Sequence, residues 1–395
     1  MMVKINKLFS NQAIATFYLV LMCITILPLE GYEVSYIKVA AMALSPLVFL
    51  KTPYISKAII WGGLYIFIIV ISAMRFSSFR ASTVIYLSLF LLMFGMFYNL
   101  VYKGAFSIDY FIKLLKFIIL SYTVCLILQQ LMILLEVRYF PWINLMGNKY
   151  LEIFRSNSLS MEPAHSARIL TVCFFALLKT DEIKNGKVKL REFYNQYKWI
   201  IIGFLYSMLT MGSATAIVGL GILSLYFIKR KYVVYIIPLL LLFYFIIPII
   251  DYTPLNRART VVEATMTGDA KTVIHEDMSA SVRVVPLLNT LNELDIFSTE
   301  TWLGKGNKIE GNYMADTKFL KGRMVGGITE YGLLSYIVSL IFVFSCCVRR
   351  FFSLECLIFI MLLGAGILNI YYVWASLMIF TAIKYFEKTH RIEVE

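Results

Sequence analysis

The feature that most constrains this chain is a series of long apolar stretches that recurs from one end to the other. About a dozen such stretches each approach the ~20 residues that a helix needs to cross a hydrocarbon core of roughly 30 Å. Only 15% of the 395 residues are charged and 60% are hydrophobic, whereas about a quarter of the residues in a soluble domain are charged. A soluble fold is therefore excluded, and we expect an all-α, polytopic integral membrane protein.

The apolar stretches predict about 12 transmembrane helices. Two stretches are too long for one crossing, so each is divided, at Met211-Gly212-Ser213 and at Leu368-Asn369-Ile370. No small-residue cleavage site follows the first stretch, which we therefore expect to remain as a span. The predicted helices cover residues 11–29, 35–50, 57–74, 82–101, 110–135, 164–178, 198–211, 213–228, 232–250, 327–347, 353–368 and 370–386.

The distribution of charge predicts the orientation of these helices. If both termini are cytoplasmic, most of the 37 Lys and Arg residues fall on the cytoplasmic side, which then carries the whole formal net charge of +13. Such an excess of Lys and Arg on the cytoplasmic side is typical of membrane proteins. The high isoelectric point therefore reports topology, and it gives no argument for binding nucleic acid.

Two outward loops are too long to be simple connections, residues 136–163 and residues 251–326. Long loops in compact proteins tend to be functional. The second loop contains apolar residues at helical spacing from Val284 to Leu294, which predicts an amphipathic helix on the outer membrane surface. We therefore divide the chain into a membrane domain over 1–250, a long outer loop over 251–326, and a membrane domain with a cytoplasmic tail over 327–395.

The first group of ionisable residues lies where the shorter loop re-enters the membrane. Arg155, Glu162, His165 and Arg168 fall close together there, and Pro163 is well placed to start a helix. Charges at this depth are costly, so they pair with one another or face a wet cavity or a substrate. The alternative interpretation is interfacial capping with a local ion pair between Glu162 and Arg168.

Two further groups lie in and after the longer loop. Arg283 opens the amphipathic helix, Lys305 stands in a Gly-Lys-Gly turn, and Arg323 and Glu330 flank the entry to the next span. A guanidinium suits phosphate oxygens because it is planar, forked and permanently charged. Snorkelling of the arginine to the interface and simple positional anchoring are the alternatives for these residues.

Several local motifs resemble those of the O-antigen and capsule polysaccharide polymerase (Wzy) family, relatives of the O-antigen ligases. The likeness covers most of the chain, including the number of spans and the long outer loop before the last few. It departs from the family in having Val282 between Ser281 and Arg283. It also lacks the His-centred outer-loop motif of a ligase, unless His275 takes that place. The similar segments are Arg155…Glu162-Pro163, Leu209-Thr210-Met211-Gly212-Ser213, Ser281-Val282-Arg283…Trp302-Leu303-Gly304-Lys305-Gly306 and Thr329-Glu330-Tyr331-Gly332.

The resemblance implies a GT-C-like glycosyltransferase of the bacterial cytoplasmic (inner) membrane, joining undecaprenyl-pyrophosphate-linked repeat units on its outer face. Its partners would be the lipid-linked oligosaccharide, membrane lipid, a flippase and a chain-length regulator. A leaving group with two phosphates needs fixed cations, and the acceptor hydroxyl needs a base. The catalytic residues would then be Glu162, His165 and Arg283, and the substrate-binding residues would be Arg155, Arg168, Arg323, Lys305 and Glu330.

The residues also bear on cofactors and on competing functions. None of the six cysteines forms a CxxC pair and the chain has three histidines, so we expect neither a metal nor another cofactor. An O-antigen ligase differs from a polymerase chiefly in its acceptor, which no motif specifies. A flippase or transporter of lipid-linked oligosaccharide is the other alternative, but it should show two similar halves and short loops.

Overall fold

The structure is a computed structural model that describes residues 10–24, 35–75, 81–137, 153–228, 278–304, 325–363 and 370–394, with a few single residues between 259 and 274. Within these residues every regular element is a helix, as expected for an all-α protein. The elements are α2 (Asn11–Cys23), α3 (Tyr36–Leu44), η1 (Ser45–Leu50), α4 (Lys57–Met74), α5 (Ala81–Tyr102), α6 (Ile108–Leu134), η2 (Ile153–Arg155), α7 (Pro163–Asn185), α8 (Leu190–Thr210), α9 (Ala214–Ser224), η3 (Leu225–Phe227), α13 (Met278–Glu293), α14 (Thr299–Leu303), η6 (Val325–Gly327), α16 (Ile328–Cys346), α17 (Leu354–Ile358), η7 (Phe359–Leu363) and α18 (Tyr371–Val394).

Most of the predicted helices are present, and three of them are clearly longer than predicted: α7, α8, and α18, which continues to Val394 instead of ending at residue 386. The predicted helix 57–74 coincides with α4, and the predicted break near Gly212 separates α8 from α9. By contrast, α7 continues to Asn185 and α8 begins already at Leu190, because polar residues there form i,i+3 ion pairs, Lys179 with Glu182 and Lys189 with Glu192, each at 2.8 Å. The predicted helix 232–250 and the far ends of 11–29 and 353–368 lie outside the described residues.

Four helices of the described chain, α4, α5, α6 and α16, are long and apolar enough to cross a membrane. Their outer surfaces suit lipid: α4 buries Tyr65 and Ile69 while Ile60 and Phe67 are about 60% exposed. α2, α3 with η1, α9 with η3, and α17 with η7 are apolar but shorter. The chain is therefore an all-helical protein with apolar membrane-type helices, and the count of twelve spans stays a prediction.

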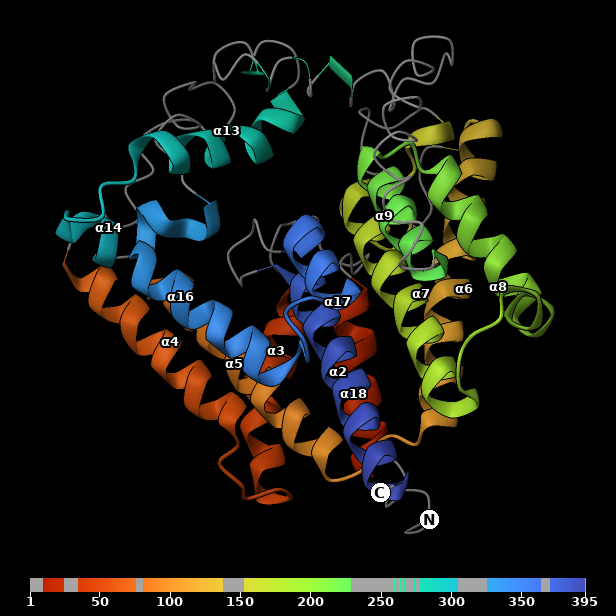
Figure 1. Cartoon of the computed structure of the whole chain (residues 1–395), viewed down its shortest axis with the longest axis horizontal. Helices are drawn as coiled ribbons and strands as arrows, with labels where there is room; N and C mark the ends of the chain where they lie inside the picture. Colours follow the sequence, from red (N-terminus) through yellow and green to blue (C-terminus); the bar gives the residue numbers. More distant parts are fainter. Residues whose placement is uncertain are drawn as a thin grey trace.

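α18 forms the centre of the helical body, where it packs against α2, α5 and α7 (Figure 1). Its Trp374 is fully buried and stacks on Phe90 of α5 with ring centroids 5.6 Å apart. Phe94 of α5 and Phe342 of α16 contact the same indole. Aromatic rings bury large areas, so this cluster fixes the position of α18 against the neighbouring helices.

α14 is attached to α16 through two facing glycines. Gly304 and Gly332 both have φ near +80°, and a Cβ built on Gly332 would lie 2.2 Å from the carbonyl oxygen of Trp302. Only glycine allows both that backbone conformation and this close approach. α16 in turn packs along α4, where the hydroxyl of Ser72 donates to the carbonyl of Tyr331 at 2.9 Å.

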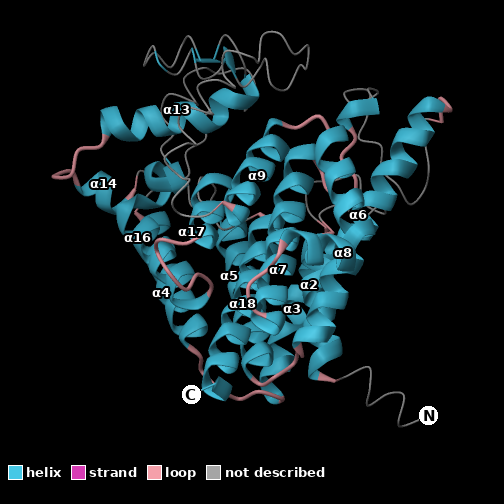
Figure 2. Cartoon of the chain, turned by 45° about the vertical axis from the view of Figure 1, so that its right-hand side comes forward, coloured by secondary structure: helices cyan, strands magenta, loops and turns pink. Residues whose placement is uncertain are grey.

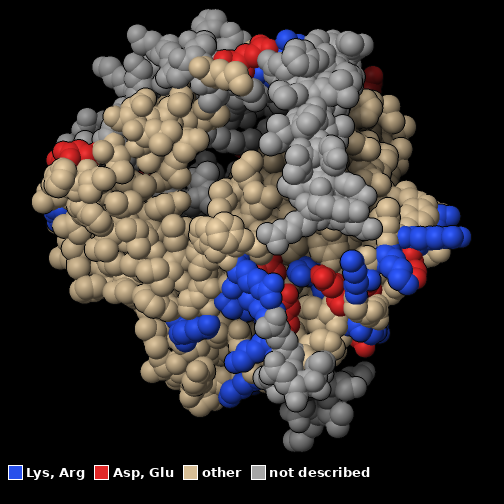
Figure 3. Space-filling model, in the orientation of Figure 1, with Lys and Arg blue, Asp and Glu red and all other residues tan. Residues whose placement is uncertain are grey.

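The predicted amphipathic helix is present as α13, and it lies at the end of the molecule opposite the C-terminal end of α18 (Figures 1 and 2). Val285 of α13 is buried, while Leu287 and Leu291 are exposed. Figure 3, in the orientation of Figure 1, shows most of the visible Lys and Arg gathered over the lower half of the molecule, interleaved with some Asp and Glu, below a largely uncharged region. α13, the longest described helix of the long loop, therefore lies away from the end of the molecule where these cations gather.

We predict that Ser298 and Lys388 lie on opposite sides of the membrane. Cysteines placed at these two positions, in a chain whose own cysteines have been replaced, should react with a membrane-impermeant maleimide from opposite faces of sealed vesicles. Ser298 precedes α14 and Lys388 is an exposed residue of α18. Labelling of both positions from one face would contradict the topology.

Candidate functional site

An irregular segment, residues 156–162, enters the helical body just before α7. Its polar residues Ser156, Asn157, Ser158 and Ser160 are all at most 4% exposed. Irregular backbone at membrane depth is tolerated only when its polar groups are satisfied by the protein or by a wet cavity. The hydrogen-bonding partners of this segment therefore decide whether it can exist there.

α6 supplies most of those partners. The side-chain amide of Gln129 donates to the carbonyl of Ser158 at 3.0 Å and accepts from its backbone N–H at 2.7 Å. The hydroxyl of Ser158 donates to the carbonyl of Tyr122 at 2.6 Å, and the Tyr122 hydroxyl lies 3.1 Å from that of Ser160. These bonds hold the segment against α6 in one conformation.

The turn between α8 and α9 closes the other side of the segment. Gly212 has φ +63°, and a Cβ built there would lie 1.8 Å from the carbonyl oxygen of Phe154. Arg155, a predicted substrate-binding residue, lies beside the same turn, with its Cγ 3.5 Å from that Cβ position. The turn that the sequence predicted therefore serves as a wall for the segment that precedes α7.

Glu162 and Pro163 form the start of α7, as predicted. Pro163 is the first helical residue and Glu162 is the N-cap, where the positive end of the helix dipole stabilises a carboxylate. The Glu162 side chain makes no capping hydrogen bond and is 54% exposed. It is instead 3.8 Å from Nε2 of His165, whose side chain is 20% exposed. The structure therefore brings the two candidate bases together.

Arg168 lies one turn further along α7 and turns to α18. Its guanidinium carbon is 4.7 Å from the ring centroid of Tyr372, and the ring of His165 is 4.6 Å from the same tyrosine. Nε of Arg168 is buried and has no hydrogen-bond partner within the described chain. The ion pair between Glu162 and Arg168 that was considered as an alternative does not form, since His165 occupies that place.

A fully buried cation contacts the neighbouring tyrosine of α18 and was missed by the sequence analysis. Lys38 of α3 is 0% exposed, its ammonium lies 3.8 Å from the ring centroid of Tyr371, and it donates to the carbonyl of Ile24. Tyr371 and Tyr372 are neighbours at the start of α18, so Lys38 and Arg168 lie on two consecutive tyrosines. A lysine within an apolar stretch was the available signal, because such charges are costly and usually functional.

Among the remaining predicted site residues, Glu330 belongs to a different pair of helices. Glu330 lies in α16, which packs on α4, and the charge of Glu330 acts on the hydroxyl of Tyr65 in α4. Arg283 lies in α13. Lys305 and Arg323 lie outside the described residues. The described site therefore consists of Glu162, His165, Arg168 and Lys38 around the two tyrosines of α18.

We predict that Gly212→Ala destabilises the segment that presents Glu162. A side chain there is strained in the left-handed region, by about 1–3 kcal/mol, and it also displaces the carbonyl of Phe154. In detergent the variant should unfold at a lower temperature than the parent chain. Gly221→Ala is the matched control, because nothing lies within 4 Å of its Cβ position in α9; it should be neutral or stabilising by up to about 1 kcal/mol. Equal melting temperatures for the two variants would contradict the prediction.

Comparisons of the chain with protein-family models, with curated proteins and with solved structures found no match. The family resemblance of the motifs therefore rests on the residues of this chain alone.

Proposed function

We propose that the chain is a membrane glycosyltransferase that polymerises lipid-linked oligosaccharide repeat units. The observation that carries this proposal is the group formed by Glu162, His165 and Arg168 at the start of α7, with Lys38 close by on the Tyr371–Tyr372 pair. The group combines a carboxylate and an imidazole with a half-buried arginine and a fully buried lysine. A transfer reaction with a pyrophosphate leaving group needs a base of this kind and fixed positive charge.

The orientation and finer architecture belong to the same proposal. The end of the molecule that carries α13 and the start of α7 faces the outside of a bacterial cytoplasmic membrane, and both termini are cytoplasmic. The chain crosses the membrane about twelve times in a GT-C-like arrangement. The positive bias of the opposite end supports this orientation (Figure 3).

In the proposed reaction an acceptor sugar hydroxyl attacks the anomeric carbon of the donor sugar. A new C–O bond forms, the bond between that carbon and the pyrophosphate oxygen breaks, and lipid pyrophosphate leaves with the electron pair. Glu162 accepts the proton of the acceptor hydroxyl, with His165 as its neighbour at 3.8 Å. Arg168 stabilises the charge that develops on the leaving group, and Arg283 of α13 is the proposed second guanidinium.

We predict that Glu162→Gln abolishes polymer formation while leaving the protein folded. Glutamine keeps the size and hydrogen bonding of the side chain and removes its basicity. Purified protein is incubated with synthetic undecaprenyl-pyrophosphate repeat unit, and the product is examined for a ladder on a gel. Glu136→Gln is the control, since Glu136 is an exposed carboxylate that follows α6.

Three outcomes of this assay would change the assignment of the base or of the activity. An active Glu162→Gln together with an inactive His165→Ala would move the role of base to His165. Activity in both variants would move the base away from the start of α7. Wild-type protein that forms no ladder, but transfers preformed polymer to an added acceptor, would favour the ligase over the polymerase.

We predict that Arg168→Ala lowers turnover by about 10²–10³, the range for removal of one preorganised donor. Arg168→Lys should restore only part of the loss, because lysine has neither the planar fork nor the stacking surface over Tyr372. Initial rates at saturating donor are compared at equal levels of folded protein. Arg75→Ala, at the end of α4, serves as a control outside the site. An Arg168→Ala enzyme with wild-type turnover would remove Arg168 from the mechanism.

A further inference from the structure

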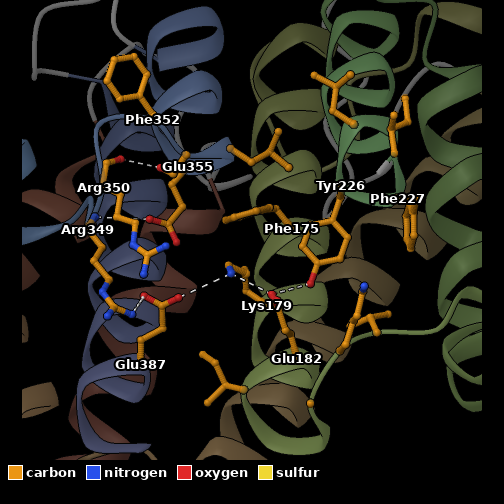
Figure 4. A pocket seen from close by; sticks show the side chains of 18 of the residues that line it. Phe175, Lys179, Glu182, Tyr226, Phe227, Arg349, Arg350, Phe352, Glu355 and Glu387 are labelled. Carbon is orange, nitrogen blue, oxygen red and sulfur yellow. Dashed lines mark hydrogen bonds and ion pairs between the residues drawn. The ribbon is translucent and has the colours of Figure 1, made fainter. Parts of the chain in front are cut away.

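A cavity of about 940 Å³ lies toward the end of the molecule opposite α13. One wall is formed by the last turns of α7 together with η3, and the other by the connection between α16 and α17 and by the last part of α18 (Figure 4). It contains none of the residues of the candidate active site. The helices of both walls end at the basic end of the chain.

The acidic side chains of this cavity are already engaged. Lys179 contacts Glu182 at 2.8 Å and reaches Glu387 on the opposite wall at 3.6 Å (Figure 4). Arg349 lies 2.8 Å from the other oxygen of Glu387, and its backbone N–H donates to the buried Glu355 at 3.4 Å. These contacts tie the two walls together. Glu182 and Glu387 have cationic partners, whereas Glu355 accepts a hydrogen bond from a backbone N–H.

Two cations that line the cavity are not engaged in this way. The exposed side chains of Lys187 and Arg350 make no ion pair or hydrogen bond with any described part of the chain. The cavity therefore presents two cationic side chains without a partner among the described residues, beside an inner network in which Lys179 and Arg349 are already paired. Phosphate oxygens are the natural complement of a guanidinium and an ammonium.

The rest of the lining is apolar and partly turned outward. Phe175, Val188 and Leu354 line the cavity, Phe227 is 38% exposed and Phe352 is 96% exposed. A small inorganic anion makes no favourable contact with such an apolar surface, whereas the acyl chains of a lipid pack against it. Basic pockets between transmembrane helices on the cytoplasmic side bind the head groups of anionic lipids.

We propose that this cavity binds an anionic phospholipid of the cytoplasmic leaflet. Its phosphate lies between Lys187 and Arg350, and its acyl chains extend along Phe227 and Phe352. Occupation would join the α7 wall to the α18 wall, the same two helices that carry the candidate active site at their opposite ends. The inference concerns a site and a ligand that are separate from the proposed glycosyl transfer, so each stands or falls by its own measurement.

The test measures lipid binding to the full chain in neutral detergent by native mass spectrometry. Phosphatidylglycerol should bind, phosphatidylcholine should bind at least about tenfold more weakly, and inorganic phosphate at millimolar concentration should not displace the lipid. Removing both cations with Lys187→Ala and Arg350→Ala should weaken phosphatidylglycerol binding about tenfold or more, since each charge near the surface contributes about 1 kcal/mol. Arg191→Ala should leave binding unchanged, because Arg191 is an exposed arginine of α8 that does not line the cavity.

Other outcomes overturn the proposal. Equal binding of phosphatidylglycerol and phosphatidylcholine would show that the negative charge of the head group is not recognised. Displacement by inorganic phosphate would show that the site binds a small anion and not a lipid. An Arg191→Ala effect as large as that of the double variant would reduce the site to general surface charge. The exposed single change Arg350→Glu guards against misfolding of the double variant. If Arg350→Glu keeps the parent melting temperature, it must still lose phosphatidylglycerol, and undiminished binding would refute the assignment.

Discussion

The arrangement of the candidate site depends on hydrogen bonds that hold a non-helical segment inside a bundle of apolar helices. An unpaired backbone group at membrane depth costs several kcal/mol, so residues 156–162 can remain there only with dedicated partners. Gln129 and Tyr122 of α6 supply them through contacts of 2.6–3.1 Å. Without this support Glu162 would have no fixed place from which α7 could begin.

The sequence was sufficient for the features that depend on local properties. Apolar runs located the helices, Pro163 located the start of α7, and the turn at Gly212 was placed between two short helices. The polar extensions of α7 and α8 were not predicted, because hydropathy marks only where an apolar stretch ends. The helix itself continues beyond that point where ion pairs such as Lys179 with Glu182 support it. Local composition therefore located the helices more reliably than it located their ends.

The candidate site was only partly accessible to the same reasoning. Glu162, His165 and Arg168 lie within two turns of one helix, so their proximity follows from sequence spacing. Lys38 and Tyr371 are separated by almost the whole chain, and only the packing of α18 against α2 and α5 brings them together. Glu330 was grouped with this site by motif order, yet it belongs to the α4–α16 side, a distinction that requires the fold.

The facing glycines of α14 and α16 have a consequence for how the long loop is held. With no side chain between Gly304 and Gly332, the two backbones are in direct contact, and Thr290 of α13 accepts a further hydrogen bond at 2.9 Å from the N–H of Val325. α13 is thus mounted on α16 and α4, whereas Glu162 is mounted on α6 and α7. Arg283 and Glu162 therefore belong to two separate groups of helices. Their separation is set by the distance between these two groups of helices, so a repacking where the groups meet can change that separation without altering either residue.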